Sequence, residues 1–146
     1  MIETALSSVY FIVAVVLLGI AVYLIAAASL YLSIWLFWCQ RGKDVLFVYS
    51  ESPVWQAYLE AQVLPKIAER AVVMNWSERK KWRISLARFA FSYFGTWREF
   101  NPLAIVFRPW RRAQVFRFWQ PFRDYKHGHD ESLKKLESEF FHALEE

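Results

Sequence analysis

Residues 9–38 read VYFIVAVVLLGIAVYLIAAASLYLSIWLFW, and this stretch decides how the chain is organised. No charged side chain lies between Glu3 and Arg41. A helix needs about 20 apolar residues to cross a bilayer core of about 30 Å, so this run is long enough to span with residues to spare. We therefore predict one N-terminal transmembrane helix within residues 1–40, followed by a separate domain over residues 41–146.

Two other interpretations of this stretch are weaker. A secretory signal peptide begins with basic residues and has an apolar segment of about 7–15 residues, whereas this chain begins Met1-Ile2-Glu3-Thr4. Ala26-Ala27-Ala28 resembles a cleavage site, but cleavage there would leave a strongly apolar new terminus at Ser29. A buried core helix is disfavoured because the remaining residues are too few to enclose it.

Flanking residues predict the orientation of the helix. Arg41 and Lys43 follow it directly and no basic side chain precedes it, so the positive-inside rule places residues 41–146 in the cytoplasm and the N-terminus outside. Aromatic rings, which favour membrane surfaces, lie near both ends of the run. They are Tyr10 and Phe11 at one end, and Tyr31, Trp35, Phe37 and Trp38 at the other.

The chain has a single cysteine, Cys39, so no intramolecular disulfide can form. It lies at the end of the apolar run, where membrane proteins can be palmitoylated, and it is a candidate lipidation site. An unmodified residue at the membrane surface is the alternative that we favour.

Charge is distributed unevenly after the apolar run. Residues 66–126 contain 14 Lys and Arg against 4 Asp and Glu, whereas residues 127–146 contain 2 basic and 6 acidic residues. The central segment is therefore far more basic than the whole-chain net charge of +4 suggests. Such a segment indicates an anionic partner.

Apolar stretches separated by turn-forming residues predict the order β-α-β-α-β-β-α. We expect strands over 44–50, 71–76, 103–107 and 115–119, and helices over 54–70, 78–94 and 131–146, the first interrupted by Pro65. Helical spacing predicts the inward faces. They are Val54, Tyr58, Ala61, Leu64 and Ala68 in the first helix, Trp82, Leu86, Phe89, Ala90 and Tyr93 in the second, and Leu133, Leu136, Phe140 and Leu144 in the third.

This order resembles the thioredoxin fold over about residues 44–145. Ser50-Glu51-Ser52-Pro53 precedes the Pro-interrupted helix, and Asn101-Pro102 precedes the third strand, where that family has a cis-proline. Gly128 separates the last strand from the last helix, as in the family. The resemblance implies a small thioredoxin-like α/β domain.

The resemblance does not extend to redox chemistry. The family's Cys-x-x-Cys motif begins its first helix, whereas residues 50–58 here contain no cysteine, so dithiol–disulfide exchange has no nucleophile. A Rossmann-like fold would explain the first five elements equally well. However, no Gly-x-Gly-x-x-Gly follows the first strand, so nothing in the sequence supports dinucleotide binding.

Three segments combine basic and aromatic side chains, and they are the strongest candidates for a binding surface. Anionic lipid head groups attract each nearby Lys or Arg by about 1 kcal/mol, and Trp favours the membrane surface. A membrane-protein partner would use the same Arg and Trp residues as anchors. Nucleic acid is a weaker alternative because no nucleic-acid motif is present. The segments contain Arg79, Lys80, Lys81, Trp82 and Arg83; Arg108, Trp110, Arg111 and Arg112; and Arg117, Trp119 and Arg123.

Two polar groups are weaker candidates. Ser50, Glu51 and Ser52 follow the first strand, where open α/β sheets bind ligands, but a helix-capping loop is the interpretation that we favour. His127-Gly128-His129-Asp130 offers three metal-ligand side chains, but His142 lies about three turns along the last helix. We predict no metal site and no cofactor.

These observations favour a non-catalytic accessory or adaptor protein that binds anionic lipid or a membrane-protein partner. The alternative is an enzyme that acts on a membrane-associated or phosphorylated substrate. In that enzyme Arg108, Arg111 and Arg112 would hold the anion, and the Ser50–Ser52 loop would carry the chemistry.

Overall fold

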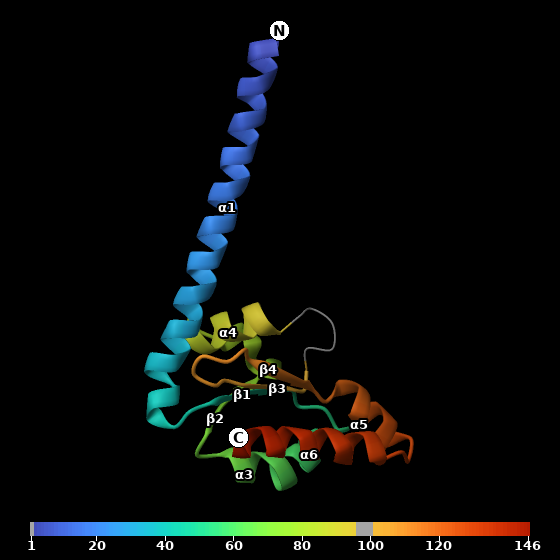
Figure 1. The fold of residues 1–146 in the computed structure, drawn as a ribbon. Coiled ribbons are helices and arrows are strands. Elements are labelled where there is room, and N and C mark those ends of the chain that lie inside the picture. Colours follow the sequence, from blue (N-terminus) through green and yellow to red (C-terminus); the bar gives the residue numbers. More distant parts are fainter. Residues whose placement is uncertain (1, 96–100) are drawn as a thin grey trace.

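The computed structural model describes residues 2–95 and 101–146, and its longest element is helix α1 (Ile2–Phe37). Figure 1 shows that α1 projects from a small domain packed against its C-terminal end. Of the described helices, α1 alone is long and apolar enough to cross a membrane. Every side chain from Leu6 to Ala26 is exposed, whereas Ala27 is the first that the domain partly covers.

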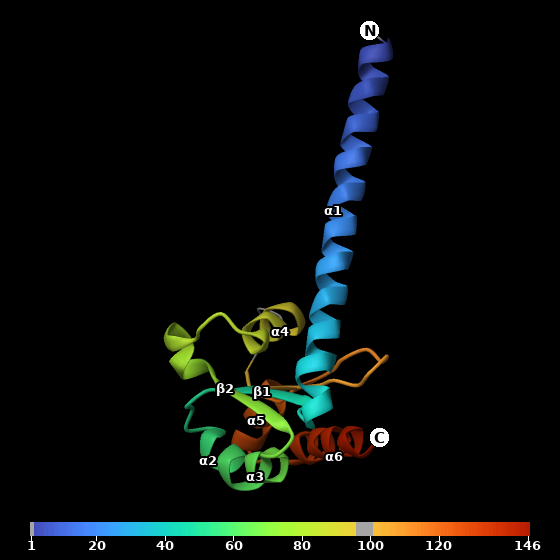
Figure 2. The ribbon, with the colours of Figure 1, turned by 90° about the vertical axis from the view of Figure 1, so that its left-hand side faces the viewer.

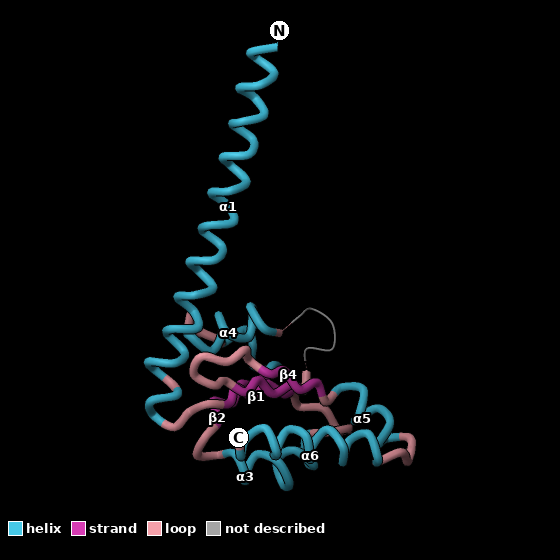
Figure 3. Tube along the Cα trace, viewed as in Figure 1, coloured by secondary structure: helices cyan, strands magenta, loops and turns pink. Residues whose placement is uncertain are grey.

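The domain is built on a four-stranded mixed sheet in the order β2 (Ala71–Asn75), β1 (Val45–Tyr49), β3 (Leu103–Val106), β4 (Gln114–Arg117). β1 pairs parallel with β2 and antiparallel with β3, which pairs antiparallel with β4. Figure 3 shows the strands lying together between the helices. The structure thus confirms a mixed α/β domain after a long apolar helix.

A short 3₁₀ turn, Cys39–Arg41, leads the chain from α1 into the sheet. Gly42 follows with φ 73°, a left-handed conformation that glycine adopts without steric cost. The Asn101–Pro102 peptide, which precedes β3, is cis.

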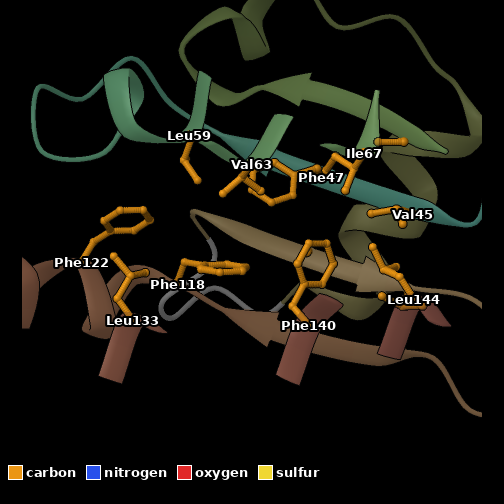
Figure 4. Close-up of a cluster of buried hydrophobic side chains, with 13 residues drawn as sticks. Val45, Phe47, Leu59, Val63, Ile67, Phe118, Phe122, Leu133, Phe140 and Leu144 are labelled. Carbon is orange, nitrogen blue, oxygen red and sulfur yellow. The ribbon is translucent and has the colours of Figure 1, made fainter. Parts of the chain in front are cut away.

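Helices cover both faces of the sheet (Figures 1 and 2). One face carries α2 (Gln56–Tyr58), α3 (Leu64–Ile67), α5 (Trp119–Lys126) and α6 (Glu131–Glu145), and the other carries α4 (Leu86–Phe94) and the end of α1. β1 is buried on both sides, because its side chains alternate between two apolar clusters. Figure 4 shows the first cluster, which includes Phe47, Leu59, Val63, Ile67, Phe118, Phe122, Leu133, Phe140 and Leu144.

The last helix has the predicted inward face. Leu133, Phe140 and Leu144 are buried, and Leu136 is partly buried against the same cluster. The apolar side chains recur at helical spacing in a segment of otherwise polar residues, so the pattern is unambiguous.

The predicted helix over 78–94 is wrong in its first half. Trp76–Lys81 forms a 3₁₀ helix, η3, and the α-helix starts only at Leu86, where the Ser85 hydroxyl accepts a hydrogen bond from the Arg88 N–H at 3.3 Å. Trp82, between the two helices, packs against Trp76 and Phe91, and the α-helix begins after it. The helix ends at Phe94 and is capped by Gly95, in agreement with the predicted end at residue 94.

The predicted fourth strand is also too long. β4 ends at Arg117, and Trp119 is the first residue of α5, a helix that the sequence interpretation omitted. Apolar residues at 118 and 122 suit a helix face as well as a strand end. Packing decides between them, because Phe118 and Phe122 both enter the first core cluster.

The inward face predicted for 54–68 is correct in part, because Val54, Tyr58 and Leu64 are partly buried against the first core cluster. Ala61 and Ala68 are exposed, whereas Leu59, Val63 and Ile67 are fully buried. A π-helical turn, Leu59–Val63, lies immediately before Pro65, which has no N–H to continue the α-helical bonding. A π turn inserts an extra residue, so it changes which side chains face the sheet.

Candidate functional site

The side of the domain from which α1 projects carries most of the exposed basic and apolar side chains. We call it the α1-side face, and it consists of η3, α4 and the loop of residues 107–113 between β3 and β4 (Figure 2). The opposite layer contains α6, which lies within the acidic segment noted above. The domain therefore has a polarity of charge along the direction of α1.

The aromatic residues at the C-terminal end of α1 contact the domain. The sequence had predicted that these residues lie at the membrane surface. The Trp35 and Trp110 ring centroids are 5.1 Å apart, and Tyr31 packs edge-on against Phe94 at 5.3 Å. Ile34 is buried in the second core cluster. The apolar run is longer than a bilayer requires, and its surplus residues pack against the sheet layer.

Helix α4 has apolar side chains on two sides. Ala90 and Phe91 are buried against the sheet, whereas Phe89 is 58% exposed. Tyr93 contacts α1, and its hydroxyl lies 3.3 Å from that of Tyr23. Phe89 and Tyr93, both predicted to face the core, instead lie on the outer side of α4.

The first basic segment is exposed except for its tryptophan. Arg79, Lys80, Lys81 and Arg83 are exposed, and Ile84 beside them is 80% exposed. Lys81 pairs with Glu78 at 2.9 Å, and this hydrogen bond raises the pKa of Lys81. Trp82 is a packing residue, since its indole N–H donates to the Asn75 carbonyl at 3.1 Å.

The second basic segment is divided between a structural and an exposed part. Arg108 donates to the Asp44 carboxylate at 2.7 Å and to the Ala143 carbonyl at 2.8 Å, so it is already engaged. Trp110, Arg111 and Arg112 are exposed beside α1.

The third basic segment lies away from the other two. Trp119 and Arg123 belong to α5, whose core residues join the opposite layer, and the Arg123 guanidinium stacks over Trp119 at 4.7 Å. Arg117 ends β4. The structure therefore brings two of the three predicted segments to the α1-side face.

The Ser50–Ser52 loop acts as a structural turn. Glu51 accepts a hydrogen bond from the Asn75 amide at 2.8 Å, and the Ser52 hydroxyl accepts one from the Val54 N–H at 3.3 Å. The Ser50 carbonyl accepts from the Trp55 indole at 3.1 Å. These contacts fix the loop that leads from β1 into α2.

The remaining candidates take structural positions. Gly128, at φ 87°, lies in the turn between α5 and α6, and Asp130 forms an ion pair with Lys134 of α6. Within residues 2–95 and 101–146, no three His, Cys, Asp or Glu side chains are grouped to hold a metal ion. Cys39 is partly buried and packs against the second core cluster.

Sequence reasoning missed four residues of the α1-side face: Ile84, Arg88, Phe89 and Tyr93. One signal was present, because Leu86, Phe89, Phe91, Tyr93 and Phe94 supply more apolar residues than one helix face can bury.

Comparison of the chain with models of protein families, with curated proteins and with solved structures gives no match.

Proposed function

We propose that this chain is a single-pass membrane protein whose cytoplasmic domain lies with its α1-side face on anionic lipid. In this role the domain is a non-catalytic accessory or adaptor module. The anchor holds the domain at a fixed height, and the basic residues of the face add attraction to the lipid head groups.

One observation carries the proposal: the exposed apolar stretch of α1 ends beside α4, on the basic and aromatic face of the domain. The exposed apolar stretch from Leu6 to Ala26 contains 21 residues. At 1.5 Å per residue these residues span about 32 Å, which is long enough to cross a bilayer core of about 30 Å. Tyr23, near the end of that stretch, contacts Tyr93 of α4, and this contact supports a position of α4 close to the membrane surface.

The charge of the α1-side face supports the cytoplasmic orientation. Arg79, Lys80, Arg83, Arg111 and Arg112 lie exposed on this face. Basic residues close to a membrane are retained on the cytoplasmic side. A protease-cleavable tag at each terminus tests this: in sealed inside-out vesicles we expect the C-terminal tag to be cleaved and the N-terminal tag to be protected. The reverse pattern would place the domain outside, and a short product lacking the apolar stretch would indicate a cleaved signal peptide.

We further propose that the domain has a thioredoxin-like fold without the redox activity of that family. The sheet order β2-β1-β3-β4, with one parallel and two antiparallel pairs, and the helices on both faces support this proposal. The family's cysteine positions are occupied by a hydrogen-bonded turn at residues 50–55.

Hydrogen–deuterium exchange of the full chain tests the lipid contact. We compare nanodiscs of phosphatidylcholine with nanodiscs that also contain phosphatidylglycerol. We expect slower exchange over residues 79–94 in the anionic nanodiscs, and we expect high salt to reduce this protection because salt screens exposed charges. Equal exchange in both lipids would contradict the proposal and favour a protein partner for this face.

A pair of matched variants shows whether position or total charge matters. Lys80→Gln with Arg83→Gln removes two charges from the α1-side face, and Lys126→Gln with Lys135→Gln removes two from α5 and α6. We expect only the first pair to lose the protection in anionic nanodiscs. Equal losses would mean that net charge, not this face, binds the lipid.

The non-catalytic assignment rests on the hydrogen bonds of Arg108 and of the Ser50–Ser52 loop. Arg108, one of three residues that would hold an anion in the enzyme alternative, is paired with Asp44, and the Ser50–Ser52 loop is bonded within the fold. Turnover of a phosphorylated substrate by the purified full chain, abolished by Ser50→Ala, would overturn this assignment.

A further inference from the structure

A hollow of about 520 Å³ lies between α1 and the loop of residues 107–113. Ala28, Leu32 and Trp35 of α1 form one wall, and Trp110, Arg111 and Arg112 form much of the other. The hollow starts two residues beyond Ala26, where the exposed apolar stretch of α1 ends. On the proposed function it therefore opens at the level of the lipid head groups.

The lining changes from apolar to cationic along the hollow. The α1 wall carries no charged side chain, because none occurs between Glu3 and Arg41. The loop wall ends in two exposed guanidinium groups, those of Arg111 and Arg112. An apolar wall that meets a cationic rim complements a molecule with a hydrocarbon chain and a phosphate.

Trp110 gives independent support, because its backbone has an unfavourable conformation and its apolar side chain is exposed. Its φ is 62°, in the left-handed region that bulky residues rarely adopt, and its side chain is 89% exposed. Strain of this kind is concentrated at functional sites. The loop presents the indole beside Trp35, at 5.1 Å between ring centroids, where Trp side chains favour the membrane surface.

The arginines of the loop differ in what they contact. Arg108 is held by Asp44 and by the Ala143 carbonyl, so it fixes the base of the loop. The Arg111 side chain is 66% exposed, and its guanidinium forms a long ion pair, 3.7 Å, with Glu146 among the described residues. Arg111 and Arg112 are therefore the groups that can turn toward a phosphate.

We propose that this hollow binds one anionic glycerophospholipid. One acyl chain extends from Ala28 into the bilayer along the exposed stretch of α1, the glycerol region packs beside the paired indoles of Trp35 and Trp110, and the phosphate accepts hydrogen bonds from Arg111 and Arg112. This proposal rests on the membrane-anchored function above, but it adds one defined site to a face that otherwise contacts many lipids.

Native mass spectrometry of the full chain, released from detergent micelles, tests the stoichiometry. We titrate phosphatidylglycerol and, separately, phosphatidylcholine. We expect one phosphatidylglycerol to be retained at low lipid concentration, with phosphatidylcholine retained more weakly. Retention of no lipid, or a random series of adducts equal for both lipids, would overturn the proposal.

Matched variants locate the site. Arg111→Gln with Arg112→Gln should weaken the first phosphatidylglycerol adduct at least about tenfold, at the known scale of basic residues on anionic lipid. Lys80→Gln with Arg83→Gln removes the same charge elsewhere on the face and should leave that adduct unchanged. Equal weakening by both pairs would mean that charge alone binds the lipid, and the hollow would lose its role.

Trp110→Gly separates the packing part of the site from its charge. Glycine accepts the left-handed backbone, so the loop keeps its path while the indole is lost. We expect a weaker adduct with an unchanged circular dichroism spectrum. An unchanged adduct would contradict the role of the indole. The nanodisc exchange experiment is separate: if it fails while one lipid is retained here, the broad lipid-facing role is wrong and the hollow stands.

Discussion

At the scale of single residues, Asp44 connects four parts of the domain. Its carboxylate accepts hydrogen bonds from Arg70 at 3.0 Å and from Arg108 at 2.7 Å. The same two arginines donate to the Leu144 and Ala143 carbonyls, both at 2.8 Å. Carbonyls at a helix C-terminus lack partners within the helix, so these arginines satisfy the end of α6.

Asp44→Asn should destabilise the domain by about 3 kcal/mol, because the variant leaves two partly buried guanidinium groups without their counter-charge. Urea unfolding of the full chain in detergent, followed by near-UV circular dichroism, measures the change. Asp130→Asn is the control, since its ion pair with Lys134 is exposed and should matter little. Equal effects of the two substitutions would show that Asp44 is not a structural centre.

Tyr58 links the first helical segment to α6. Its hydroxyl donates to the Glu137 carboxylate at 3.1 Å, and the other oxygen of that carboxylate is buried without a hydrogen-bond partner among the described residues. Burial, followed by the charge and hydrogen bond of Glu137, raises the pKa of Tyr58 to about 12. The folded domain therefore holds this proton more tightly than the unfolded chain.

Tyr58→Phe should lower the free energy of unfolding by about 1–3 kcal/mol at neutral pH, because it leaves a buried carboxylate oxygen unpaired. Because the folded pKa is raised, the wild-type advantage is fully present below about pH 10 and is lost as the pH rises through about 12. Unfolding measured in both proteins across this range checks the sign. Tyr125→Phe changes an exposed neighbour and is the control. The difference in free energy of unfolding between this variant and the wild type should not show this loss at high pH.

At the scale of elements, α4 shows why one apolar pattern can serve two surfaces. Seven of its nine residues, Leu86-Ala87-Arg88-Phe89-Ala90-Phe91-Ser92-Tyr93-Phe94, are apolar or aromatic. Such a helix has no single inward face in its sequence. The neighbouring elements determine which side chains are buried. Phe91 is buried against the sheet, Tyr93 contacts α1, and Phe89 is exposed.

Two phenylalanines in this helix should behave oppositely. Phe91→Ala should cost about 3–5 kcal/mol, because it opens a cavity in the second core cluster. Phe89→Ala should leave urea unfolding nearly unchanged but reduce the lipid protection of residues 79–94 in nanodiscs. If Phe89→Ala unfolds the domain as Phe91→Ala does, our assignment of the two faces is wrong.

At the scale of the whole molecule, α1 has two consecutive parts. Residues Leu6–Ala26 are exposed, and the following residues contribute Leu30, Ile34 and Trp38 to the second core cluster. The folded domain therefore includes the C-terminal end of α1, and its packing crosses the boundary that the sequence placed at residue 40.

Truncation tests this two-part arrangement. A fragment of residues 27–146 should unfold cooperatively, whereas residues 41–146 should unfold at lower urea concentration or aggregate, because they lack Leu30, Ile34 and Trp38 of the second core cluster. Sedimentation and urea unfolding of both fragments measure the difference. Equal stability would show that α1 only tethers the domain.

The sequence by itself determined the long apolar helix, the mixed α/β class, the inward face of α6 and the basic central segment. These features depend on local composition and on regular spacing within one element, so they need no knowledge of neighbours. The tertiary structure alone decided which face of α4 is buried, where β4 gives way to α5, and which basic segments share a surface. Those outcomes depend on which elements pack together: the end of α1 contacts the sheet layer, and this contact places Trp110 beside Trp35 and α4 beside Tyr23 and Tyr31.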